Sequence, residues 1–147
     1  MFDKLKQVLK NAQLLDDSKA WFFAIDRNAK DEIIRLNTYD QLYNEGIDSE
    51  EISLGEYALF TQAEKISKGE RYDHVTLKDT GAFYDSFIIR VDSKGFNIIA
   101  DDVGNYDRPL TEVYGIEILG LTDENKGWLS DFIMTNYQEY VRRTLLQ

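Results

Sequence analysis

Apolar residues recur every three or four positions near the start of the chain, which predicts an N-terminal helical region. Within residues 2–15, one stripe of an amphipathic helix is formed by Phe2, Leu5, Val8, Leu9, Ala12 and Leu15. The sequence Asp-Asp-Ser that follows supplies turn and N-cap side chains. A second helical pattern covers residues 19–43, and it fits either one long helix or two helices with a break near Asn28. Gly46 suits the left-handed position that ends a helix.

Residues 46–80 lack this periodicity and are polar for most of their length. They predict a long, mobile segment with a short helical turn at 59–67. Connections inside compact domains are usually shorter, so we expect this segment to be functional or to be ordered by a partner.

Two apolar runs, 87–91 and 96–100, follow and predict the strands of a β-hairpin. They flank the sequence Asp-Ser-Lys-Gly, where Gly95 is free to take a positive φ. A short helical turn over 82–86 is expected to lead into the first strand.

The last part of the chain predicts a long amphipathic helix. Thr122 is a good N-cap, and the two acidic residues after it suit the positive end of a helix dipole. Helical spacing then continues through Trp128, Leu129, Phe132, Ile133, Tyr137, Tyr140 and Val141. Arg142 and Arg143 suit its negative end.

Together these elements predict a single α+β domain over residues 1–147. Residues 1–45 form its helical region, a helix or a helix pair, and 46–80 its long segment. Residues 81–147 are expected to hold an antiparallel β-sheet built around 87–100, with the C-terminal helix packed on one face.

Charge and composition restrict the partners of this domain. The net charge of −10 repels phosphate backbones and anionic membrane surfaces, so we expect neither specific nucleic-acid binding nor membrane binding. The chain has no apolar run of the roughly 20 residues that a membrane span needs, and a soluble protein made in a cytoplasm is expected. Aromatic residues make up 13%, which favours either a surface that a partner buries or a tyrosine-rich core.

No catalytic constellation stands out, so we expect no enzyme activity and no cofactor. The single histidine, His74, has no marked Ser partner, and the absence of cysteine excludes thiol nucleophiles and thiolate metal sites. Asp101, Asp102 and Asp107 do not have the spacing of an EF-hand calcium loop. The glycines form neither a phosphate-binding loop nor a dinucleotide fingerprint.

Two motifs joined by the predicted hairpin carry a resemblance. In the first, Leu77 precedes Thr80-Gly81, and apolar residues and Ser86 follow before the strand. In the second, Leu119-Gly120-Leu121 precedes Thr-Asp at the start of the last helix. Supporting positions are Leu54, Tyr57, Thr61, Lys65, Lys68, Gly69, Tyr114 and Gly115.

In this order, over roughly residues 50–140, the chain resembles the tail-completion and virion-morphogenesis proteins of tailed bacteriophages, which join head and tail at the neck. It departs from them after Thr80-Gly81, where relatives often carry a basic residue and this chain has aromatics. The acidic, tyrosine-rich composition is also similar to that of proteins from Bacteroidetes phages and prophages, including the crAss-like group.

The resemblance implies a virion structural protein that forms a homo-oligomeric ring of about six or twelve subunits at the head–tail junction. Its other partners would be phage neck, portal or tail proteins, and it would lie in the virion after assembly in the host cytoplasm. Thr80 and Gly81 are expected to cap and bend the chain rather than to contact a partner.

We expect the interface in the 47–79 segment, the 101–113 loop and the exposed aromatic residues Tyr57, Phe60, Tyr72 and Tyr106. The alternative is an acidic, monomeric binding or inhibitor module for a basic protein, because opposite charge speeds association.

Overall fold

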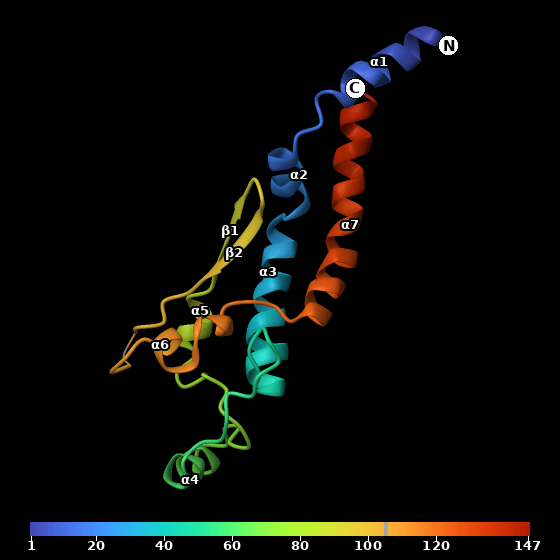
Figure 1. The fold of residues 1–147 in the computed structure, drawn as a ribbon. Helices are drawn as coiled ribbons and strands as arrows, with labels where there is room; N and C mark the ends of the chain where they lie inside the picture. Colours follow the sequence, from blue (N-terminus) through green and yellow to red (C-terminus); the bar gives the residue numbers. More distant parts are fainter. Residues whose placement is uncertain (105) are drawn as a thin grey trace.

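The structure is a computed structural model, and it describes residues 1–104 and 106–147. Figure 1 shows an elongated molecule in which the β-hairpin lies at one side, next to α2 and α3. The helices are α1 (Phe2–Ala12), α2 (Asp17–Ala24), α3 (Arg27–Arg35), the π-helix η1 (Leu36–Glu45), α4 (Leu59–Ser67), α5 (Ala82–Asp85), α6 (Leu110–Tyr114), the 3-10 helix η2 (Ile116–Ile118) and α7 (Asp123–Leu145). The strands are β1 (Ile88–Asp92) and β2 (Gly95–Ile99). The predicted α+β class is confirmed.

The helical region contains separate helices rather than one long one. Asp26 accepts a hydrogen bond from the Ala29 amide (2.9 Å) and so begins α3. The break therefore lies between α2 and Arg27, just before the predicted position at Asn28. Helix α3 continues into η1, which ends at Gly46 with φ +65°, the left-handed conformation that was predicted. The first helix ends at Ala12, three residues before the end of its apolar stripe.

The predicted hairpin is confirmed within one residue at each end. Its antiparallel register runs from the pair Ile88–Ile99 to the pair Asp92–Gly95. The Asp92 carboxylate accepts a hydrogen bond from the Lys94 amide (2.8 Å), which closes the turn. Within the described residues the sheet has only these two strands.

The segment 46–80 contains α4 at 59–67, where the helical turn was predicted. Elsewhere it follows turns and loops that hydrogen bonds define. The Asp48 carboxylate accepts from the amides of Glu50 (2.9 Å) and Ile52 (3.0 Å), and the Val75 amide donates to the Gly55 carbonyl (2.9 Å). The mobility expected of this segment stays a prediction.

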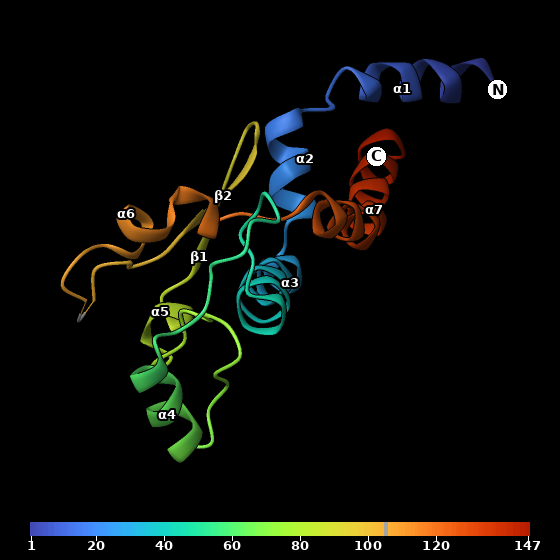
Figure 2. The same cartoon turned by 60° about the horizontal axis from the view of Figure 1, so that its bottom comes forward.

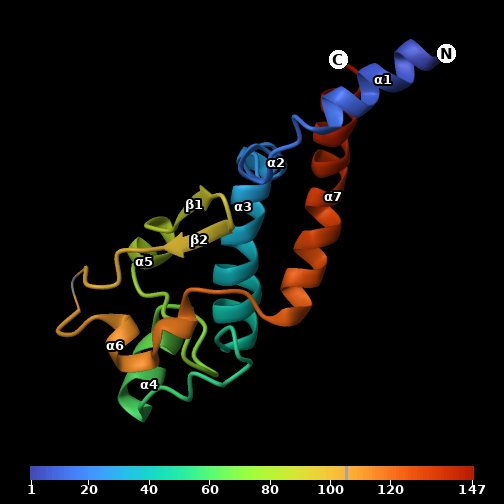
Figure 3. The same cartoon turned by 45° about the horizontal axis from the view of Figure 1, so that its top comes forward.

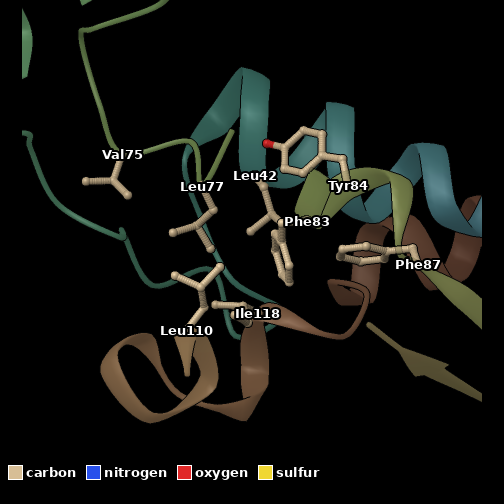
Figure 4. Close-up of a cluster of buried hydrophobic side chains, with 8 residues drawn as sticks. All are labelled: Leu42, Val75, Leu77, Phe83, Tyr84, Phe87, Leu110 and Ile118. Atoms are coloured by element: carbon tan, nitrogen blue, oxygen red, sulfur yellow. The ribbon is translucent and has the colours of Figure 1, made fainter. Parts of the chain in front are cut away.

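Two buried clusters form the core. The first joins η1, the end of the 46–80 segment, α5, α6 and η2, and Figure 4 shows its side chains converging. Its members are Leu42, Val75, Leu77, Phe83, Tyr84, Phe87, Leu110 and Ile118. The second joins the hairpin to the helices through Ile25, Ala29, Ile33, Leu36, Ile89, Leu121 and Leu129. The C-terminal helix α7 enters this second cluster beside the hairpin, while most of its contacts are with α2, α1 and α3.

Candidate assembly surfaces

Two buried amide side chains of η1, Asn37 and Gln41, hold segment 118–122, which contains the second predicted motif. Asn37 donates to the first carbonyl of the segment (2.9 Å) and accepts from the Gly120 amide (3.0 Å). Gln41 donates to the Gly120 carbonyl (2.8 Å) and accepts from the amide of the last residue (2.9 Å). We call this pair the amide clamp. Because its polar groups are paired inside the protein, it fixes the path of the chain into α7.

The motif residues themselves pack against the interior. Leu121 is buried in the second cluster, and Leu119 is half-buried against the first. A Cβ atom on Gly120 would lie 2.9 Å from the Cβ of Ser49, so only glycine fits without a shift. The structure thus gives this motif a packing role.

The first motif also forms a structural joint. Thr80 accepts a hydrogen bond from the Ala82 amide (3.2 Å), and Gly81 takes φ +92° at the start of α5. Ser86 donates to the Phe83 carbonyl (2.7 Å) and accepts from an amide after β2 (2.9 Å). Leu77 is buried in the first cluster. These contacts agree with a cap and bend that orient α5.

Tyr57 and Tyr106 were expected to be exposed, and this expectation is wrong. Both are half-buried and line one hollow of about 420 Å³ between α4 and the body of the protein. The Tyr57 hydroxyl lies 3.1 Å from the Thr76 hydroxyl and accepts a hydrogen bond from the Thr76 amide (3.0 Å). Burial raises the pKa of the Tyr106 phenol. These two tyrosines attach the α4 end to the core.

Lys65 of α4 points into the same hollow and is buried, with only 8% of its surface exposed. Its Nζ donates to the Glu70 carboxylate and to the Lys78 carbonyl (3.2 Å each) and lies 4.8 Å from the centre of the Tyr57 ring. The buried side of α4 is therefore a polar, paired contact.

The outward side of α4 is apolar. Phe60, a predicted interface residue, is 82% exposed, and Leu59 beside it is 83% exposed. Ala63 and Ile66 continue the same face one and two turns later and are also exposed. Tyr72 is exposed as well, outside this helix. We call Leu59, Phe60, Ala63 and Ile66 the α4 face.

A second apolar face lies on α1. Phe2, Leu5 and Leu9 of the predicted stripe are exposed rather than buried. The helix is held to the rest of the protein by buried Asn11, whose amide donates to the carbonyls of Leu145 (3.1 Å) and Gln147 (3.2 Å). We call Phe2, Leu5 and Leu9 the α1 face. Figures 1, 2 and 3 agree that α1 and α4 lie at opposite ends of the molecule.

An apolar groove of about 650 Å³ lies between β2 and α7. Trp21, Phe96, Leu129 and Ile133 line it together with the motif residues 119–121. The second motif thus lines part of this groove.

His74 makes structural contacts. Its Nε2 lies 2.7 Å from the Tyr43 carbonyl oxygen, and its ring packs over Gly46 so closely that a Cβ there would lie 2.4 Å from the ring. The histidine thus reinforces the end of η1. The expectation that the protein is not an enzyme stays a prediction.

The acidic loop uses its carboxylates to shape the chain. Asp102 accepts hydrogen bonds from the amide and hydroxyl of Thr111, which lower the pKa of its carboxyl group. Asp101 accepts from the Val103 and Gly104 amides (3.2 Å each). Within residues 1–104 and 106–147, no three His, Asp or Glu side chains are grouped to hold a metal ion.

Comparison of the chain with protein-family models, with curated proteins and with solved structures gave no match. The resemblance to phage tail-completion proteins therefore rests on the motifs of the sequence. In the part of the chain that the structure describes, every helix is too short or too polar to cross a membrane.

Proposed function

We propose that this chain is a structural protein of a tailed-phage virion that forms a ring at the head–tail junction. The two motifs and the hairpin between them suggest the family. The observation that carries the proposal is the pair of exposed apolar faces, α1 and α4, at opposite ends of one elongated molecule. Large exposed apolar patches are typical of surfaces that a partner covers.

The position of the faces favours a ring over a twofold dimer. A twofold dimer pairs one surface with the same surface of its partner, whereas two different surfaces at opposite ends support head-to-tail association. Such association either closes into a ring or continues as a filament. A ring at the neck of a virion requires closure, and the portal or the tail tube would supply a template for it.

The middle of the molecule is suited to hold the two ends at a fixed spacing. The amide clamp ties η1 to the start of α7, and the two buried clusters lie between α1 and α4. Because paired buried polar groups define one arrangement of the backbone, successive subunits would repeat the same geometry.

The net charge of −10 adds a further property to the proposed ring. An acidic channel would repel the DNA backbone and let it pass without adhesion. A ring structure with basic side chains lining the channel would contradict this part of the proposal.

The first experiment is to measure the mass of the purified protein over a concentration series and to image large species by electron microscopy. Closed rings of uniform subunit number are the expected result. A protein that stays monomeric, even when mixed with the portal or tail proteins encoded beside it, would contradict the proposal. A stable one-to-one complex with a basic protein would support the acidic inhibitor module instead.

A further inference from the structure

We propose that the occupant of the α4 face is α1 of a second copy of this chain. This inference rests on the proposed ring, because it names the two surfaces that meet between its subunits. In this arrangement, α1 of each subunit packs on the α4 face of the next subunit.

The two faces match in length and in kind. Helix α1 has 11 residues and α4 has 9, so they are about 16 Å and about 13 Å long at 1.5 Å per residue. Each presents apolar side chains over two turns, at positions 2, 5 and 9 on α1 and 59, 60, 63 and 66 on α4. Helices with such stripes pack against each other by placing the side chains of one between those of the other.

The charges of the two ends are complementary. Residues 2–12 carry three lysines and one aspartate, a net charge of +2 in an otherwise acidic protein. Residues 46–80, which include α4, carry eight carboxylates and four basic side chains, a net charge of −4. Opposite charge at the two ends favours α1 on α4 and disfavours α1 on α1 or α4 on α4.

The charged groups are free to take part. Lys4, Lys6 and Lys10 are exposed, flank the apolar stripe, and pair with no carboxylate within the described residues. At the other end, Glu56 and Asp79 are exposed and are likewise without an ion pair in residues 1–104 and 106–147. Association of the two ends would therefore bring together charges that form no ion pair within the described residues of the free protein.

A single chain does not make this contact within itself, because α1 and α4 lie at opposite ends in all three views (Figures 1, 2 and 3). The contact is formed between copies and leaves one α1 face and one α4 face unfilled in every open assembly. Growth stops only when the last α1 meets the first α4.

The test uses the absence of cysteine from the chain. Leu9→Cys and Ile66→Cys are made as separate proteins, mixed at equal concentration and oxidised. Both residues are exposed, at 60% and 53%, so both variants are expected to fold. The expected product is the mixed disulfide between the two proteins, formed in clear excess over either homodimer. The matched control replaces Ile66→Cys by Ile88→Cys, an exposed apolar position on the hairpin, and should give only random disulfides.

A second test mixes two proteins that each lack one face. Leu5→Glu removes the α1 face and Phe60→Glu removes the α4 face. Each variant alone is expected to be monomeric, and their mixture should form a one-to-one heterodimer that grows no further. A Phe60→Glu protein that dimerises alone, through α1 on α1, would overturn the inference, and so would equal yields of all three disulfides.

These outcomes separate the inference from the proposed function. If closed rings form without the 9–66 disulfide and persist in the Leu5→Glu variant, the proposed ring is supported and the α1–α4 contact is overturned. If the mixed disulfide forms but the protein assembles only into open filaments, the α1–α4 contact is supported and the closed ring is overturned. If the cysteine variants give no excess of the mixed disulfide and the wild-type protein does not associate, the inference is overturned, while virion assembly with portal or tail proteins still tests the function.

Discussion

The middle of the molecule and its α4 end both bury polar side chains, but they differ in the apolar residues they leave exposed. In η1 the buried side chains include Asn37, Thr38 and Gln41, and on α4 the buried residue is Lys65, while Leu59 and Phe60 on the outer side of α4 are more than four-fifths exposed. The difference reflects what each helix lies against. The amides of η1 face an irregular segment whose backbone groups need partners, and α4 has no layer of the protein over its apolar side. Buried polar residues thus mark an internal joint, and exposed apolar residues mark an open end.

The largest effect on stability is expected when Gln41, one of the two side chains of the amide clamp, is replaced. Gln41→Ala removes partners from the Gly120 carbonyl, the Thr122 amide and the Asn125 side chain in one step. The free energy of unfolding should fall by about 3 kcal/mol, because buried polar groups would be left without hydrogen bonds. Urea denaturation measures this loss. Gln138→Ala, at an exposed position of α7, is the control and should change it little.

The next largest effect on stability is expected from a substitution at Gly46, where η1 ends. Gly46→Ala places a side chain at φ +65° and against the His74 ring, and it should cost about 2 kcal/mol of stability. In a His74→Ala background the steric part disappears, so the same substitution should cost about 1 kcal/mol. Denaturation of the four proteins of this cycle checks the prediction. Equal costs in both backgrounds would show that His74 does not press on this position.

A smaller effect is expected on the buried side of α4. Lys65→Met keeps the length of the side chain but leaves the Lys78 carbonyl and the Glu70 carboxylate without this donor. Stability should fall by about 1 kcal/mol, a modest loss because Glu70 is partly solvated. Thermal unfolding measures it, with Lys68→Met, an exposed lysine of the same end, as the control. A more stable Lys65→Met protein would show that the polar contact does not hold α4 in place.

The smallest effect on stability is expected on the outward side of α4. Phe60→Ser should change the free energy of unfolding by less than about 0.5 kcal/mol, since the ring is exposed in the free protein. The same substitution should reduce self-association, which sedimentation measures. A large loss of stability without any loss of association would mean that Phe60 belongs to the core.

The sequence pattern correctly predicted the elements that depend on neighbouring residues along the chain. The hairpin, the N-cap at Thr122, the end of η1 at Gly46 and α4 could all be predicted, because turn residues, caps and apolar spacing act over a few positions. Thr122 accepts from the Asn125 amide (3.2 Å), as a cap does.

Long-range contacts could not be predicted from this periodicity. Asn37 and Gln41 read as the polar face of a helix, because no local signal shows that the backbone of segment 118–122 will lie over them. For the same reason the α1 stripe predicted an amphipathic helix but not that its apolar face would lie exposed, and the tyrosines at 57 and 106 were expected to be exposed. A pattern reports which face of a helix is apolar, and the tertiary arrangement decides what covers it.

Asn11 gives α1 its direction, since its two hydrogen bonds to the carbonyls of Leu145 and Gln147 tie the helix to the end of α7. In the proposed ring that direction sets the angle at which one subunit meets the next, and this angle determines the curvature of the ring. The number of subunits would then be encoded in one amide side chain rather than in the contact surfaces. Asn11→Ala subunits would still recognise one another, yet they would close into rings of mixed diameter.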